Sequence, residues 1–196
     1  LYVAWVDPAA PRTAGLPRVI HQALTLPVAR TAGLSTSDVI LADHVELRTG
    51  SRPPAEQSAH PYSIGALEIT PNWRRRFSRD GNLSMVFQVI NAQANEDGMP
   101  DVAVNIRIVR VAGDRETPAG SLNPHYYNAA TLGPDFNLKL GHPLFAAVSA
   151  PLATLPRGDY RAKIGVTDRL GGVSAGIDAD FSVAGTPASG QPARRR

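Results

Sequence analysis

The chain contains no cysteine, and its only lysines are Lys139 and Lys163. Without cysteine there are no disulfides and no thiolate metal sites, although the redox compartment stays undecided. No apolar run approaches the roughly 20 residues that a membrane-spanning helix needs. We therefore expect neither a disulfide scaffold nor a membrane span.

The net charge of the chain is also small. The 196 residues carry a formal net charge of +3, and three arginines lie at the extreme C-terminus, Arg194 to Arg196. Without them the rest is near neutral, which argues against a nucleic-acid partner. The tail at residues 185–196 is too polar to form a core and is expected to be disordered. Leu1 begins no signal sequence, so we expect a segment of a longer protein.

What the chain has in excess is turn residues, with 17 glycines and 17 prolines. The most informative run is residues 155–167, which begins Leu-Pro-Arg-Gly-Asp-Tyr. In immunoglobulin-like sandwiches, a Leu-x-x-Gly-x-Tyr corner turns the chain between sheets, and the tyrosine hydroxyl bonds to nearby backbone. We predict this role for Tyr160, with Gly158 providing the bend.

Apolar and polar residues alternate with a period of two in several segments, as expected for half-buried strands. The inward sets that we predict are Leu83, Met85, Phe87 and Val89; Val102, Val104, Ile106 and Ile108; Tyr160, Ala162, Ile164 and Val166; and Ile177, Ala179, Phe181 and Val183. The last two form a terminal hairpin. Further strands are expected at residues 64–70, 126–132 and 144–152, with loops at 48–63 and 112–128. The fold class is all-β, an immunoglobulin-like antiparallel β-sandwich.

Three regions are expected along the chain. Residues 1–29 predict a hairpin that resembles the closing one, since a strand ends at Asp7 as another does at Asp168. It is either the end of a preceding sandwich or part of the same sandwich. Residues 30–184 are the sandwich itself, and residues 185–196 are the tail.

The order of segments resembles a known family. It comprises Leu-x-x-Ser-Asp-Val-Ile-Leu-Ala from Leu34, a Pro-rich loop, a strand ending at Pro71, an aromatic-basic stretch, a strand ending at Asn91, the Leu-x-x-Gly-x-Tyr corner and a closing hairpin. From about Leu34 to Val183 this resembles the C-terminal β-sandwich region of exported bacterial proteins with an upstream von Willebrand factor A-like or Gly-Trp-x-Thr-Asp domain. The resemblance implies an extracytoplasmic accessory module, periplasmic, cell-surface or secreted, and supplies no catalytic residues.

Candidate catalytic and metal residues have simpler interpretations. Residues 172–176 match the Gly-x-Ser-x-Gly nucleophile elbow, but Ser174 lies between two predicted strands and no histidine follows it. The five histidines are scattered without a close pair. Glu96, Asp97 and Asp101 are weak calcium candidates, because solvated turn carboxylates are more common. We expect no catalytic residue, no metal and no cofactor.

Candidate ligand-binding residues are Trp73, Arg74, Arg76, Tyr126 and Tyr127. Guanidinium groups beside an indole suit phosphates, bases or acidic glycans, and tyrosines stack on sugars. The simpler interpretation is that the arginines cover a sheet face and the rings fill a core or its rim. The sequence thus predicts a non-enzymatic structural or protein-interaction module. A protein partner or neighbouring domain would be engaged at a sheet edge or at loops 48–63 and 112–128. The alternative is a carbohydrate-binding module that uses exposed aromatic residues.

Overall fold

The computed structural model describes residues 2–5, 18–21, 33–50, 53, 56 and 59–184. The chain divides into two compact units, Leu1–Ala32 and Gly33–Arg196. In the first unit, β1 (Tyr2–Trp5) pairs antiparallel with β2 (Arg18–His21). Both strands lie within the predicted hairpin at 1–29, and whether that hairpin ends a preceding sandwich stays a prediction. The predicted tail at 185–196 lies outside the described residues.

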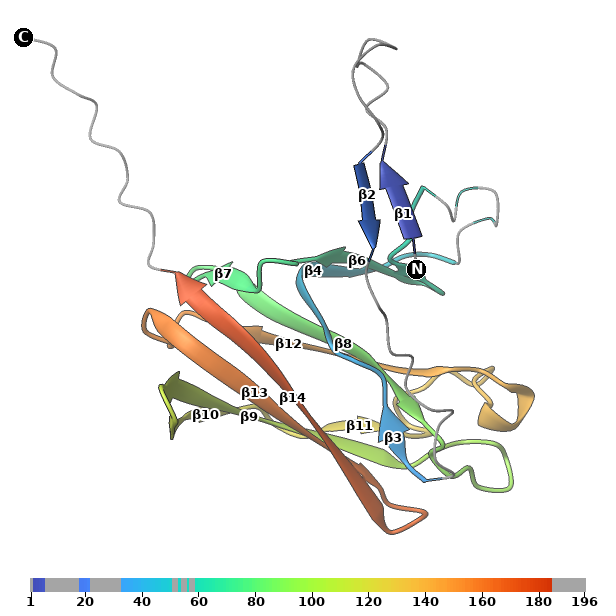
Figure 1. Cartoon of the computed structure of the whole chain (residues 1–196). Coiled ribbons are helices and arrows are strands. Elements are labelled where there is room, and N and C mark those ends of the chain that lie inside the picture. Colours follow the sequence, from blue (N-terminus) through green and yellow to red (C-terminus); the bar gives the residue numbers. More distant parts are fainter. Residues whose placement is uncertain are drawn as a thin grey trace, which may run out of the picture. The chain divides into compact units, whose positions relative to one another are not determined.

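The second unit consists of two sheets (Figure 1). The first sheet has the order β10 (Arg115–Ser121), β9 (Val102–Ala112), β13 (Gly158–Asp168), β14 (Val173–Ala184) and β7 (Arg76–Ser78), and β11 (His125–Tyr127) also pairs with β9. The second has the order β12 (Leu144–Pro151), β8 (Asn82–Ile90), β4 (Ile40–Leu47), β6 (Leu67–Pro71) and β5 (Ser63–Ile64), and β3 (Ser35–Thr36) also pairs with β8. All pairs are antiparallel except β7 with β14. One short 3₁₀ turn, η1, spans Leu138–Leu140.

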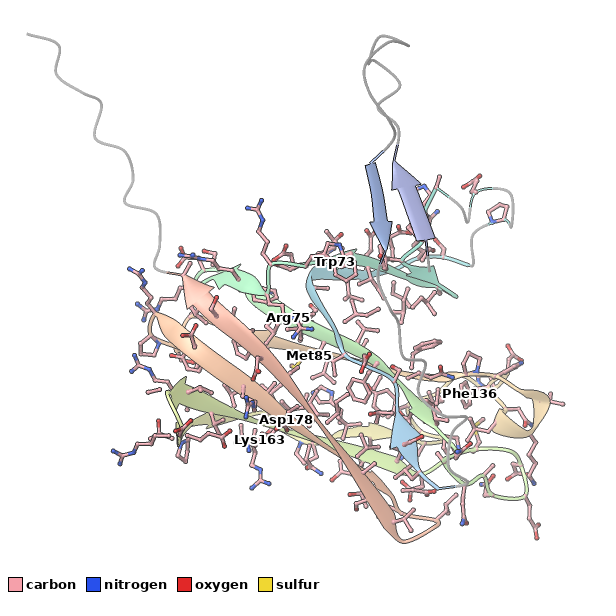
Figure 2. All side chains as sticks on the ribbon, in the orientation of Figure 1. Trp73, Arg75, Met85, Phe136, Lys163 and Asp178 are labelled. Carbon is pink, nitrogen blue, oxygen red and sulfur yellow. The ribbon has the colours of Figure 1, made fainter. Side chains whose placement is uncertain are left out.

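The core lies between the two sheets and is built from the alternating positions. Phe87 of β8, Ile106 of β9, Ile164 of β13 and Phe181 of β14 belong to one buried cluster. Met85, labelled in Figure 2, is fully buried in the same cluster. Alternation requires that every second residue of each strand points to this layer. The immunoglobulin-like β-sandwich is therefore confirmed.

The predicted tyrosine corner is also confirmed. Tyr160 is 1 % exposed, and its hydroxyl donates to the Pro156 carbonyl at 2.6 Å. Its ring stacks on Phe181 with 5.6 Å between centroids and an interplanar angle of 21°. Phe181 in turn meets Phe77 edge-on at 6.2 Å. The corner thus joins the loop before β13 to the aromatic part of the core.

Three segment predictions are wrong. The strand expected at 64–70 is interrupted, because β5 and β6 pair with each other across a turn at Gly65, where φ is 60°. The expected loop at 112–128 contains β10, which follows a tight turn at Gly113, where φ is 60°. Pro118 and Gly120 count against a strand in the sequence, yet an edge strand tolerates both, and the register shifts between them. The strand expected at 126–132 ends at Tyr127, because Asn128 starts a turn in which its side-chain oxygen accepts from the Ala130 amide.

Candidate functional site

Two shallow grooves lie side by side at the end of the sandwich where the tyrosine corner is. The larger, about 340 Å³, is lined by Arg74, Arg75, Val111, Asp159, Tyr160, Arg161, Asp180, Phe181 and Ser182. The smaller, about 220 Å³, is lined by Arg76, Arg157, Gly158, Asp159, Ser182 and Val183. Because Asp159 and Ser182 line both, the grooves form one surface, which we call the arginine end. The end is built from the 72–76 loop and the adjoining ends of β9, β13 and β14.

The arginine end carries concentrated positive charge. Five arginines and two aspartates line it, which leaves a formal excess of three positive charges, five minus two. The whole chain has a net charge of only +3, and Arg194 to Arg196 account for that number. The excess at this end is therefore balanced by acidic groups elsewhere on the chain. Segregated charge of this kind attracts anionic partners.

Only one of the lining arginines is tied into a salt-bridge network in the described part of the chain. Arg161 bonds Asp180 through two N–H groups, at 2.6 and 3.2 Å, and Glu116 through a third at 2.9 Å. Lys163 binds the other Glu116 oxygen at 2.8 Å. Hydrogen bonding from Lys163 lowers the Glu116 pKa, and hydrogen bonding from Arg161 lowers the Asp180 pKa. Bonding to Asp180 raises the pKa of Arg161, so the network stays charged.

The other arginines are free to meet a ligand. Arg74, Arg76 and Arg157 are exposed and form no ion pair within the described ranges of the chain. Arg75 has a φ of 50°, in the left-handed region, which costs roughly 1 kcal/mol for a residue with a Cβ. Its carbonyl accepts from the Ser182 amide at 2.8 Å, which fixes the loop against β14. Its charge also contributes to the lowered pKa of Asp180.

Trp73 lies in the same loop but has a different neighbour. It is 67 % exposed, and its ring centroid is 5.1 Å from that of Tyr62, with the planes tilted by 58°. Tyr62 packs against a small second cluster of buried residues, Ala42, Ile69 and Val86. Trp73 therefore contacts Tyr62 at a tilted angle, while most of its side chain is exposed.

The two tyrosines of β11 lie near the opposite end of the sheet. Tyr126 is 45 % exposed, and the Arg169 guanidinium carbon is 5.8 Å from its ring centroid. Tyr127 is partly buried, and its hydroxyl accepts from the Ala147 amide of β12 at 3.1 Å. Burial raises the Tyr127 pKa. Tyr127 therefore links the two sheets through its hydroxyl oxygen.

The predicted aromatic platform is not assembled. Tyr126 pairs with Ala103, which pairs with Thr167, which pairs with Ser174 of β14. Arg76 pairs with Ser182, eight residues further along β14. At about 3.3 Å per residue, Tyr126 is displaced by roughly 26 Å along the strands from the loop that carries Trp73, and four strand spacings also separate them across the sheet. One sugar ring cannot contact both, so these rings do not form the shared surface that the carbohydrate alternative requires.

Ser174 and the acidic loop were the other candidates. Ser174 is the second residue of β14 and follows a hairpin turn, not a strand-to-helix turn. Its hydroxyl is 3.0 Å from that of Thr167. Among the residues that the structure describes, no three His, Asp or Glu side chains come together as a ligand group, so Glu96, Asp97 and Asp101 are not gathered around one point. Asp101 instead bonds Arg169 at 3.4 Å.

One edge of the first sheet has unpaired backbone groups. The Ser182 amide points away from β13, towards the Arg75 carbonyl. Since direction alternates along a strand, the amides and carbonyls of Ser174, Gly176, Asp178 and Asp180 point the same way. No strand of the described chain forms a ladder with them there, because β7 pairs only with residues 182–184 and β3, which lies close to β14, pairs with β8. We call residues 174–180 the open edge of β14, and it leads directly into the larger groove at Asp180.

The other edge strands are less open. β10 contains Pro118, which lacks an amide hydrogen, and a register shift follows it. On β12, the outward Ala147 amide is occupied by Tyr127, and Pro151 ends the strand. β5 is only two residues long. The open edge of β14 therefore offers the longest row of backbone groups for another strand.

The chain was compared with known families, curated proteins and solved structures. No family model matches the chain, and no curated protein matches it in sequence. Among solved structures, it is similar to an immunoglobulin-like protein from Pseudomonas aeruginosa, at 10 % identity and a TM-score of 0.33. That match covers 76 % of this chain and 98 % of the other. In the described part of the chain, no helix has the length and apolarity needed to traverse a bilayer.

Proposed function

We propose that this chain is a non-enzymatic interaction module that binds an extended segment of a protein partner along the open edge of β14. The observation that supports the proposal is the row of unpaired backbone groups at residues 174–180. An incoming strand satisfies such groups and thereby extends the sheet, which gives affinity through main-chain hydrogen bonds. The seven residues span roughly 20 Å, enough for a strand of ordinary length.

The open edge makes a specific prediction for hydrogen exchange. In the free protein, the amides of Ser174, Gly176, Asp178 and Asp180 should exchange fast, while the intervening amides that bond β13 should be protected. A bound strand should slow the exchange of these four outward amides. Uniform protection of β14 in the free protein would show that the edge is already covered.

Gly176 allows a matched pair of variants. Proline at this position removes an outward amide that no strand of the described chain uses, whereas alanine keeps it. An added Cβ would lie 3.8 Å from the Ile164 carbonyl oxygen, an ordinary contact, so Gly176→Ala should fold normally. Thermal unfolding would confirm that both variants remain folded.

The binding test uses a random twelve-residue peptide library displayed on phage and selected on the full chain. The proposal expects peptides that bind wild type and Gly176→Ala equally and Gly176→Pro at least tenfold more weakly. Their binding should also protect the four outward amides. Peptides that bind Gly176→Pro as tightly as wild type, or a selection that yields no binders, would contradict the proposal.

We further propose that the module belongs to an exported bacterial protein, on the basis of the sequence resemblance described above. The test is to fuse the complete reading frame that encodes this chain to alkaline phosphatase, which is active only outside the cytoplasm. An inactive fusion would contradict export and leave the binding proposal unaffected.

A further inference from the structure

We infer that the segment bound by β14 is acidic at the end that reaches the arginine end. This inference rests on the proposed function, because it assumes a strand on the open edge. Asp180, Phe181 and Ser182 line the larger groove and directly continue the open edge. A strand paired with residues 174–180 therefore extends its next side chains towards Arg74 and Arg75.

The charges at this position favour carboxylates over other groups. Arg161 is already bonded to Asp180 and Glu116, so it stabilises the existing carboxylates. Arg74, Arg76 and Arg157 have no carboxylate partner within the described ranges, and Asp159 is the other acid lining the two grooves. A guanidinium presents a planar fork that binds a carboxylate through two parallel hydrogen bonds. Two or three acidic side chains would pair with the arginines that remain.

Acidic residues are disfavoured along the part of the same path that lies beside Asp178. Lys163 lies opposite Asp178, and Arg161 lies opposite Asp180, so the first sheet already pairs its charges across strands (Figure 2). Cross-strand neighbours of opposite sign are stabilising, and like charges directly opposite are destabilising. Neutral or basic residues therefore suit the part of the incoming strand beside Asp178, and acidic residues suit its end. The recognised segment thus has polarity, which fixes its direction on β14.

The test uses eight-residue peptides with five alternating threonine and valine residues and three glutamates at one end, in both sequence orders. Matched peptides replace the glutamates by glutamine or lysine. Binding is measured by fluorescence anisotropy on the full chain, at low and at 0.5 M salt. The expected result is that one glutamate peptide binds, the glutamine peptide binds more weakly and the lysine peptide does not bind. Salt should weaken the glutamate complex, because the charges are exposed.

Charge reversal identifies the arginines. The double variant Arg74→Glu, Arg157→Glu should bind the glutamate peptide roughly tenfold or more weakly than wild type, since each substitution replaces an attraction by a repulsion. Both residues are exposed and free of ion pairs within the described ranges, so the variant should fold. Arg107→Glu is the control, because Arg107 is an exposed arginine of β9 that lines neither groove. The Arg107→Glu variant should bind the glutamate peptide as tightly as wild type does.

The possible failures are distinguishable. If all three peptides bind equally and Gly176→Pro abolishes all of them, the edge proposal stands and the acidic end is wrong. If the glutamate peptide binds Gly176→Pro as it binds wild type, and dextran sulfate competes equally well, the arginines bind polyanions without a strand, which contradicts both proposals. If no glutamate peptide binds, the inference is wrong, and the library selection decides the proposed function separately.

Discussion

Replacing Asp168 by alanine should lower the free energy of unfolding by about 3 kcal/mol. The Asp168 side chain is fully buried at the end of β13. One carboxylate oxygen accepts from the Gln93 amide at 2.7 Å, and the other accepts from the amides of Leu170 and Gly171 at 3.0 and 3.1 Å. Asp168 thus ties the loop after β8 to the turn between β13 and β14.

The magnitude follows from these three bonds. A hydrogen bond to a charged group contributes roughly 1.5–3 kcal/mol, and three of them at the lower end give about 4.5 kcal/mol. Alanine also avoids the desolvation of a buried carboxylate, and the turn amides can rehydrate, which reduces the net loss to about 3 kcal/mol. Typical domains have only about 5–15 kcal/mol of stability, so the effect should be readily measured.

The Asp168→Asn variant distinguishes hydrogen bonding from charge. One side-chain oxygen remains for Leu170 and Gly171, but an amide group faces the Gln93 N–H, so donor meets donor. We expect a loss of about 1–2 kcal/mol, smaller than for alanine. Urea denaturation of the full chain gives both values, and Asp178→Ala, which removes an exposed carboxylate of β14, is the control and should stay within about 0.5 kcal/mol of wild type. An Asp168→Ala variant whose stability lies within about 0.5 kcal/mol of wild type would refute the reasoning.

Three further predictions concern other contacts. Tyr160→Phe should cost about 1 kcal/mol in urea denaturation, because the hydrogen bond to the Pro156 carbonyl is lost while the ring packing remains. No change would mean that the hydroxyl contributes nothing. Gly98→Ala should lower the free energy of unfolding by at least about 2 kcal/mol, since φ is +83° and a Cβ would overlap the Asn137 side chain. Gly133→Ala is the control and should cost much less, because a Cβ there would lie in open space. Burial raises the Tyr127 pKa above its ordinary value of 10, so the neutral side chain contributes stability that is complete below pH 10 and is lost as the pH rises through the folded pKa. Tyr127→Phe should therefore lose less unfolding free energy at alkaline pH than wild type. If the two proteins show the same dependence of stability on pH, Tyr127 is not the group responsible.

The strand faces and the tyrosine corner were predictable from the sequence because both are local patterns. Alternation in residues 83–89, 102–108, 160–166 and 177–183 assigns a face to each residue without any knowledge of partners. The same pattern also contained part of the charged network. In a hairpin with its turn at 169–172, Arg161 lies directly opposite Asp180. That pairing could have been derived from the turn position alone.

The arginine end and the open edge were not predictable in this way. Arg74 and Arg76 were candidates, but Arg157, Asp159 and Asp180 come from distant segments and contact the same grooves only because β7 pairs with the end of β14. That parallel pairing joins residues about a hundred positions apart, which no local period encodes. Likewise, Pro118 and Gly120 argued against β10, since the sequence does not show which strands lie at an edge.

By itself, therefore, the sequence determined the strands with clear alternation, which side of each is buried and that a sandwich results, since two-residue periodicity and turn chemistry act over a few neighbours. Only the tertiary structure decided that Trp73 and Tyr126 lie far apart, that three segments bring their charges together and that β14 keeps an unpaired edge. These properties depend on strand order and register, which long-range packing selects.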